Sequence, residues 1–202
     1  VAYLEEGREK LLPAPIFIEG EKSDVVVQAA LSYNTGFTEN IVSYVNNINT
    51  VEGGAHVAGF RRALTRTLKA YADKSGLLER AKVEIIGDDF REGLTAVISV
   101  KVPEPQFEGQ TKAKLGSMEA QGAVATVFGE AFASFLEENP DEAKAIINKS
   151  ILALKARKAA KAAKDSILRK GALEGMTLPG KLADCQTKDA SESELFLVEG
   201  DS

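Results

Sequence analysis

The chain has 202 residues, of which 44% are hydrophobic and 27% are charged, and its formal net charge is -5. These proportions are typical of a globular chain that is long enough to bury one large core. Its apolar runs are much shorter than a bilayer span and its first ten residues are mixed and acidic, which excludes a transmembrane segment and a secretory signal. Cys185 is the single cysteine, so an internal disulfide and a cysteine-rich zinc site are excluded. We therefore expect a reducing, cytoplasmic location and no membrane partner.

Three short segments near the start of the chain have the composition of strands. Residues 1–12, which precede them, look like the last turns of a helix that two prolines end, and we expect the protein to continue upstream of Val1. Turn residues such as Asn34-Thr35-Gly36 separate the segments. Their β-branched and apolar residues predict strands at residues 16–19, 24–33 and 41–45.

A helix and a further strand follow in the middle of the chain. From about His56 the apolar residues recur every fourth position, which predicts a helix with Phe60 and Leu64 on its inner face. Residues 83–86 fit a short strand and the end of a helical connection equally well. Strict alternation predicts a strand at residues 94–102.

Two long helices are predicted in the last part of the chain. Ser117 is the expected N-cap of the first, which extends to about Glu138. The second begins at Pro140, extends to about Arg169, and is expected to end at the glycines that follow. Strands early, a strand, loop and helix in the middle, and long helices late predict an α+β fold with helices on one face of a mixed sheet.

The second of these helices contains a strongly basic segment. Residues 144–170 hold nine lysines and arginines against one acid, Asp165. Beyond Lys155 alanine and lysine alternate with few apolar residues, so this half is expected to project from the core. Clustered basic residues of this kind bind DNA phosphates, although a solvated helix face is the commoner meaning of such a pattern.

A glycine-flanked basic loop separates the strand at residues 94–102 from the first long helix. Its sequence, residues 105–116, is Pro-Gln-Phe-Glu-Gly-Gln-Thr-Lys-Ala-Lys-Leu-Gly. A phosphate site needs backbone amides from a glycine turn and a mobile cation, which Gly109, Lys112 and Lys114 supply. By themselves, lysines in such a loop are more often only solvated.

The C-terminal segment combines Leu-Pro-Gly-Lys-Leu-Ala-Asp-Cys, residues 178–185, with an apolar run that leads into an acidic turn, residues 194–202. In order and spacing, this segment and the basic loop resemble the B subunit of bacterial DNA gyrase and its topoisomerase IV relative. The resemblance covers essentially all 202 residues, and residues 102–107 favour gyrase over topoisomerase IV.

The resemblance implies a domain organisation and a topology. Residues 1–12 would be the tail of an upstream ATPase-domain helix and residues 13–170 the transducer domain. Residues 171–193 would be a linker, and residues 194–202 the first strand of a truncated Toprim domain. The family's transducer domain has a left-handed βαβ crossover like that of a ribosomal protein, which is an exception to the usual right-handed rule.

The resemblance also implies a set of functional residues. Gln110 and Lys112 would contact the terminal phosphate of ATP bound in the upstream domain, with Lys112 stabilising charge during phosphoryl transfer. Glu199 matches a Mg²⁺ ligand and acid–base residue of DNA cleavage, whose partner acids would lie beyond Ser202. This chain alone is therefore expected to bind neither ATP nor Mg²⁺ stably and to be inactive, with Asp201 structural.

The function implied is energy transduction from ATP to the DNA gate during negative supercoiling. The expected partners are the A subunit of gyrase in an A2B2 heterotetramer, double-stranded DNA and the ATPase domain of the same chain. Lys158, Lys161 and Lys181 are the candidate DNA contacts.

The main alternative is a non-enzymatic DNA-binding or scaffold module that uses the basic helix at residues 144–170. A stand-alone phosphotransferase that uses the basic loop is disfavoured because no general base lies near a phosphate loop. The only histidine, His56, has no partner acid or thiol and is expected to cap or order its own loop.

Overall fold

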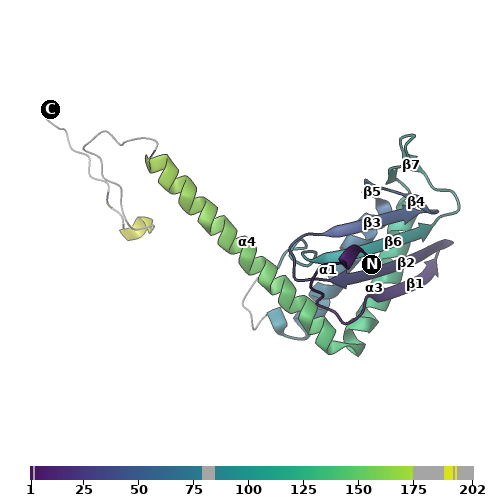
Figure 1. The fold of residues 1–202 in the computed structure, drawn as a ribbon, viewed down its shortest axis with the longest axis horizontal. Helices are drawn as coiled ribbons and strands as arrows, with labels where there is room; N and C mark the ends of the chain where they lie inside the picture. Colours follow the sequence, from purple (N-terminus) through teal and green to yellow (C-terminus); the bar gives the residue numbers. More distant parts are fainter. Residues whose placement is uncertain (2, 79–84, 175–188, 193, 195–202) are drawn as a thin grey trace. The chain divides into compact units, whose positions relative to one another are not determined.

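The computed structural model describes residues 1, 3–78, 85–174, 189–192 and 194 (Figure 1). The chain forms two compact units, Val1–Arg157 and Lys158–Ser202, each with contacts mainly within itself. The first unit contains the sheets and most of the helices. The second contains the C-terminal part of α4 (Pro140–Glu174) and a 3-10 turn, Ala190–Glu192. Among the described helices, none has the length and apolar character that crossing a membrane requires.

A five-stranded mixed sheet forms the centre of the first unit, with the strand order β1-β2-β6-β3-β4. β2 pairs antiparallel with β1 and with β6, whereas β3 and β6 are parallel. All four strands that the apolar patterns predicted are therefore present. The strands are β1 (Ile16–Lys22), β2 (Val25–Tyr33), β3 (Asn40–Val45), β4 (Ile48–Asn49) and β6 (Leu94–Lys101).

The parallel pair of β3 and β6 requires a crossover connection, because the chain must return to the same end of the sheet. Helix α1 (Ala55–Lys74) lies between these two strands in the sequence and belongs to this connection. The structure thus contains a βαβ unit, as the resemblance implies. The left-handed sense of its crossover stays a prediction.

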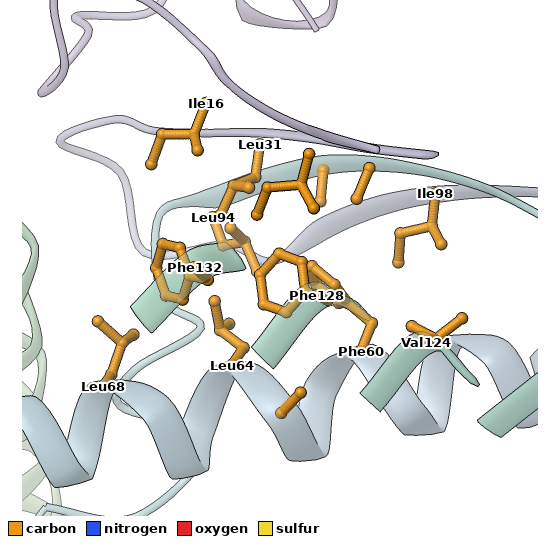
Figure 2. Packing of buried hydrophobic residues seen from close by; sticks show 14 of the residues in the cluster. Ile16, Leu31, Phe60, Leu64, Leu68, Leu94, Ile98, Val124, Phe128 and Phe132 are labelled. Atoms are coloured by element: carbon orange, nitrogen blue, oxygen red, sulfur yellow. The ribbon is translucent and has the colours of Figure 1, made fainter. Parts of the chain in front are cut away.

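Helices α1 and α3 (Met118–Glu138) lie on the same face of the sheet, as predicted (Figure 1). In the core, Phe60 of α1 meets Phe128 of α3 with ring centroids 4.6 Å apart, and Phe128 stacks on Phe132 at 5.1 Å. Figure 2 shows these rings pointing toward Leu31 and Ile98 of the sheet. Alternate strand residues supply this apolar face, so burying it against the two helices is the main source of stability.

Two boundaries differ from the predictions. Residues 3–12 contain one 3-10 turn, Tyr3–Glu5, and an isolated antiparallel bridge between Lys10 and Asn34. Gly7 has φ +77°, and the backbone amide of Leu11 donates to the Tyr33 carbonyl at 2.8 Å. The helix predicted for residues 1–12 is therefore wrong in this part. At the other end, α4 continues through Gly171 to Glu174. One glycine costs a helix only about 1 kcal/mol, which neighbours of high helix propensity offset.

Two predictions fall mainly on positions outside the described residues. Ile85 and Ile86 belong to neither a strand nor a helix, and residues 83 and 84 are not described. Of the last strand, expected at residues 194–202, only Glu194 is described.

The sequence patterns did not predict a second, three-stranded sheet with the order β5-β8-β7. β7 and β8 pair antiparallel and form a hairpin, and β5 pairs parallel with β8. The basic loop is therefore a hairpin built into a small sheet rather than an open connection. Its strands are β5 (Gly53–Gly54), β7 (Phe107–Glu108) and β8 (Lys114–Leu115).

Candidate functional site

The β7–β8 hairpin presents the Gln110-Thr111-Lys112 sequence at its tip, where all three residues are exposed. Gly109 turns the chain with φ +76°, and Lys112 itself has φ +55°. A lysine in the left-handed region is uncommon and marks a tight turn. The turn thus holds three polar side chains on a short exposed loop, which is a geometry suited to contacting an anion on another part of a protein.

The base of this hairpin is fixed by hydrogen bonds to the start of α3. The backbone N–H of Gln106 donates to the Ser117 hydroxyl at 2.9 Å. Within the hairpin, the backbone N–H of Gly116 donates to the backbone carbonyl of Gln106 at 2.8 Å. Ser117 occupies the predicted N-cap position, but its hydroxyl makes no capping bond to the helix. It connects the hairpin to α3 instead, so the exposed tip rests on a fixed base.

The two lysines of the hairpin have different surroundings. The Lys114 Nζ pairs with Glu108 Oε2 at 2.9 Å across the strands, and hydrogen bonding to Glu108 raises the pKa of Lys114. The Lys112 Nζ lies 6.0 Å from the centre of the Phe107 ring, and it has no ion-pair partner among the described residues. Lys112 is thus the lysine whose charge is available to a ligand, whereas Lys114 is part of the hairpin's own structure.

The predicted DNA contacts on α4 are partly described. Lys158 and Lys161 are both exposed in the second unit, in an exposed stretch that also contains Lys164. Lys181, like Glu199, lies outside the described residues. Within the described residues, no group of three or more His, Cys, Asp or Glu side chains is placed to hold a metal ion.

Two basic residues of the 144–170 segment are structural, which the sequence pattern did not reveal. Arg157 forms two hydrogen bonds, at 2.8 and 2.9 Å, to the fully buried carboxylate of Asp89. Lys149 is 5% exposed, donates to the Thr35 carbonyl at 2.9 Å and lies 3.8 Å from the centre of the Phe37 ring. Burial lowers the pKa of Lys149. Both residues attach the first half of α4 to loops of the first unit.

His56 orders its loop, as predicted, through contacts that the sequence did not specify. It is fully buried in the first turn of α1, and its Nε2 lies 3.2 Å from the Thr50 hydroxyl. The Thr50 hydroxyl lies 2.7 Å from that of Ser43 in β3. Burial lowers the pKa of His56 to about 4, so the ring is neutral near pH 7. The adjacent glycines of β5 were the available signal that another backbone approaches closely here.

Solved structures similar to this chain include ATPase domains of gyrase B and of topoisomerase IV. The crystal structure of the 43K ATPase domain of Thermus thermophilus gyrase B, in complex with an aminocoumarin, superimposes with a TM-score of 0.76 and 41% identity, covering 81% of this chain and 44% of that one. The topoisomerase IV ATP-binding domain of Francisella tularensis gives a TM-score of 0.67 and 32% identity, covering 77% of this chain and 42% of that one. The chain therefore has the fold of part of a type II topoisomerase ATPase region.

The sequence narrows this class to one family. The family model for DNA gyrase B matches residues 1–166, and the chain belongs to that family. The DNA gyrase B protein of Cytophaga hutchinsonii is 62% identical over 202 residues, which are 100% of this chain and 42% of the relative. The chain thus spans less than half the length of that relative. The resemblance to gyrase B drawn from the two sequence segments is confirmed.

Proposed function

We propose that this chain is the energy-coupling part of a DNA gyrase B protein, which hydrolyses ATP as a component of a type II DNA topoisomerase. Residues 13–170 would be the transducer domain, with the ATPase domain upstream and a linker and Toprim domain downstream. The observation that carries the proposal is the exposed Lys112 on a hairpin with a fixed base. Membership of the DNA gyrase B family indicates that ATP is the nucleotide that Lys112 would contact.

In this proposal the hairpin reaches the terminal phosphate of ATP bound in the upstream domain. The Lys112 ammonium would neutralise charge on the phosphate oxygens, and the Gln110 amide would donate a hydrogen bond to them. A cation already positioned where negative charge develops lowers the barrier without reorganising during the reaction. Loss of the terminal phosphate would remove the attraction and release the hairpin.

Helix α4 is the element that would carry this change toward DNA. It is continuous from Pro140 to Glu174, and its first half is tied to the first unit through Arg157 and Lys149. A displacement of the first unit would therefore move the start of α4 with it, as in rigid-body switching. The proposed partners are the gyrase A protein in an A2B2 assembly and double-stranded DNA, in the cytoplasm.

Mg²⁺ enters this proposal only through residues outside the described part of the chain. Among the described residues no acidic cluster fits a metal ion. The one candidate ligand, Glu199, lies beyond them, so no step is assigned to the metal here.

A second candidate function is DNA binding by the basic helix without any part in ATP turnover. The exposed lysines at positions 158, 161 and 164 favour it. This function would not depend on Gln110 or Lys112, so the two candidates make different predictions for hairpin variants.

The test is ATP turnover and DNA strand passage by the full-length protein together with gyrase A, comparing wild type with Lys112→Ala. Turnover should fall by about a hundredfold, on the order of the loss of one transition-state charge contact, while ATP binding is largely kept. Lys114→Ala, whose ammonium is engaged by Glu108, should cost no more than about threefold. Lys101→Ala, at an exposed strand end, is the neutral control. Unchanged turnover in Lys112→Ala would leave only the DNA-binding function.

A further inference from the structure

The inner strand of the hairpin is bonded directly to the entry of α1. β8 lies between β7 and β5, with Gly53 paired to Lys114 and Gly54 paired to Leu115. The Glu52 amide also donates to the Ala113 carbonyl at 3.0 Å. Because Gly54 immediately precedes the first residue of α1, the hairpin and the start of this helix share one backbone junction.

Gly54 permits this junction because it has no side chain. Its φ is +130°, and a Cβ placed there would lie 2.3 Å from the Leu115 carbonyl oxygen and 2.4 Å from the Leu115 amide nitrogen. Both atoms are backbone, so they cannot move aside as a flexible side chain would. Any larger residue must push β8, and with it the hairpin, away from the helix.

A buried chain of hydrogen bonds fixes the segment that carries β5. Ser43 lies in β3, Thr50 in the loop before β5 and His56 in the first turn of α1, and each is at most 3% exposed. The Ser43 hydroxyl donates to the Thr50 carbonyl at 2.9 Å and lies 2.7 Å from the Thr50 hydroxyl. Because the Ser43 hydroxyl proton is used in its bond to the Thr50 carbonyl, the Thr50 hydroxyl donates to the Ser43 oxygen. The Thr50 hydroxyl oxygen then accepts from the His56 Nε2–H across 3.2 Å.

These three residues therefore join the large sheet, the loop that leads into the small sheet, and α1 at one buried point. Since all three are buried, none of them can reach a nucleotide bound by another domain. Any effect of theirs on ATP turnover has to be indirect, through the position of the hairpin or through the stability of the fold.

We propose that Gly54 and His56 are positioning residues for the phosphate-sensing hairpin, setting how far Gln110 and Lys112 extend from the core. This inference rests on the proposed function, because it concerns the same hairpin. A cation held by a fixed support acts on a reaction far better than one that is displaced by about 1 Å.

The experiment measures kcat and KM for ATP in the full-length protein together with gyrase A. His56→Leu removes the donor to Thr50 and should lower kcat about tenfold, with KM unchanged because the ATP pocket lies elsewhere. His56→Gln keeps an N–H donor on a side chain of similar reach and should recover activity to within about threefold of wild type. Equal losses in both variants, or a change confined to KM, would overturn the proposal.

Gly54→Ala should lower kcat at least as much, because its methyl group would displace β8 directly. The matched control is Gly122→Ala on the exposed face of α3, where a Cβ would meet nothing within 4 Å. Should His56→Leu fail to fold, as judged by thermal unfolding, Thr50→Val breaks the same chain with a smaller change. Full activity in Thr50→Val together with Gly54→Ala would contradict the inference.

Combining His56→Leu with Lys112→Ala separates positioning from a general loss of stability. If His56 acts through the hairpin, the double variant should turn over ATP only slightly more slowly than Lys112→Ala alone, because only the Gln110 contact is left to lose. A further tenfold loss would show that His56 acts by another route and would overturn the inference. If Lys112→Ala itself is fully active, the proposed function fails. If only Lys112→Ala is impaired, the proposed function stands and the positioning role is wrong.

Discussion

At the scale of single residues, His56 combines complete burial with a titratable ring. Burial lowers its pKa from the ordinary 6.5 to about 4. An unfolded histidine therefore takes up a proton at a higher pH than the folded one. The contribution of neutral His56 to folding stability is fully present above about pH 6.5 and is lost as the pH falls toward 4, because the unfolded state then binds more protons.

Lowering the pH from 7 to 5 should cost the chain about 2 kcal/mol of unfolding free energy through His56 alone. Urea unfolding of wild type and His56→Gln at both pH values measures this, since glutamine does not titrate. The carboxylates of the chain titrate alike in both proteins, so their contribution cancels in the comparison. An equal loss in the two proteins would show that His56 is not protonated on unfolding.

At the scale of elements, one ion pair, between Arg157 and Asp89, contributes to the attachment of helix α4. The Asp89 carboxylate is fully buried and is held by Arg157 and by the amide of Ile86 at 3.0 Å. Removing the cation from a buried carboxylate is strongly destabilising, because the remaining charge stays desolvated. Arg157 is the last residue of the first unit, so this pair lies within that unit.

Arg157→Ala should therefore lower the unfolding free energy by about 2 to 3 kcal/mol, toward the low end for buried pairs because the Arg157 side chain is 39% exposed. Lys158→Ala, the neighbouring exposed residue, should change it by less than about 0.5 kcal/mol. Urea unfolding followed by circular dichroism gives both values. Similar stabilities for the two variants would show that the ion pair contributes little.

The contact between α1 and α3 depends on aromatic rings of unequal burial. Phe128 is fully buried between Phe60 and Phe132, whereas Phe135 is half-buried next to Phe132. Phe128→Ala should destabilise the chain by about 3 to 5 kcal/mol, because it leaves a cavity between sheet and helices. Phe135→Ala should cost about 1 to 2 kcal/mol by the smaller area removed. Thermal unfolding that ranks them in the opposite order would contradict this account of the core.

Local patterns predicted the long elements and missed the short ones for a physical reason. A strand such as β6 or a helix such as α1 repeats its burial period several times, so the period is visible in the sequence. β5, β7 and β8 have two residues each and show no period. β7 and β8 pair as a local hairpin, whereas β5 joins them through residues some sixty positions away, as the Gly53–Lys114 register shows.

The candidate site was predictable to a similar extent. The sequence and its family resemblance selected Gln110 and Lys112, and the hairpin indeed exposes both. The positions of Arg157 and Lys149 in buried contacts depend on partners far along the chain, which no local pattern reveals.

At the scale of the whole molecule, charge is distributed unevenly. The chain carries a formal net charge of -5, yet the exposed part of α4 beyond Arg157 has lysines at 158, 161 and 164 against Asp165. DNA affinity depends on local phosphate contacts rather than on the sum of charges. The proposed DNA binding by this helix is therefore compatible with the net acidic charge of the chain.

Replacing Lys158 and Lys161 together by alanine should weaken binding of duplex DNA by the full-length protein, and more so at low salt. If each lysine meets one phosphate, the slope of log K against log salt should become shallower by about 1.8, since each contact contributes about 0.9. The matched control replaces Lys22 and Lys101, which are exposed at strand ends and remove the same net charge. Fluorescence anisotropy between about 50 and 200 mM salt measures both slopes.

Equal slopes for the two double variants would mean that only net charge matters and that α4 makes no phosphate contact. A shallower slope in the α4 variant alone, with Lys112→Ala still binding DNA normally, would place DNA binding and phosphate sensing on separate elements of one chain.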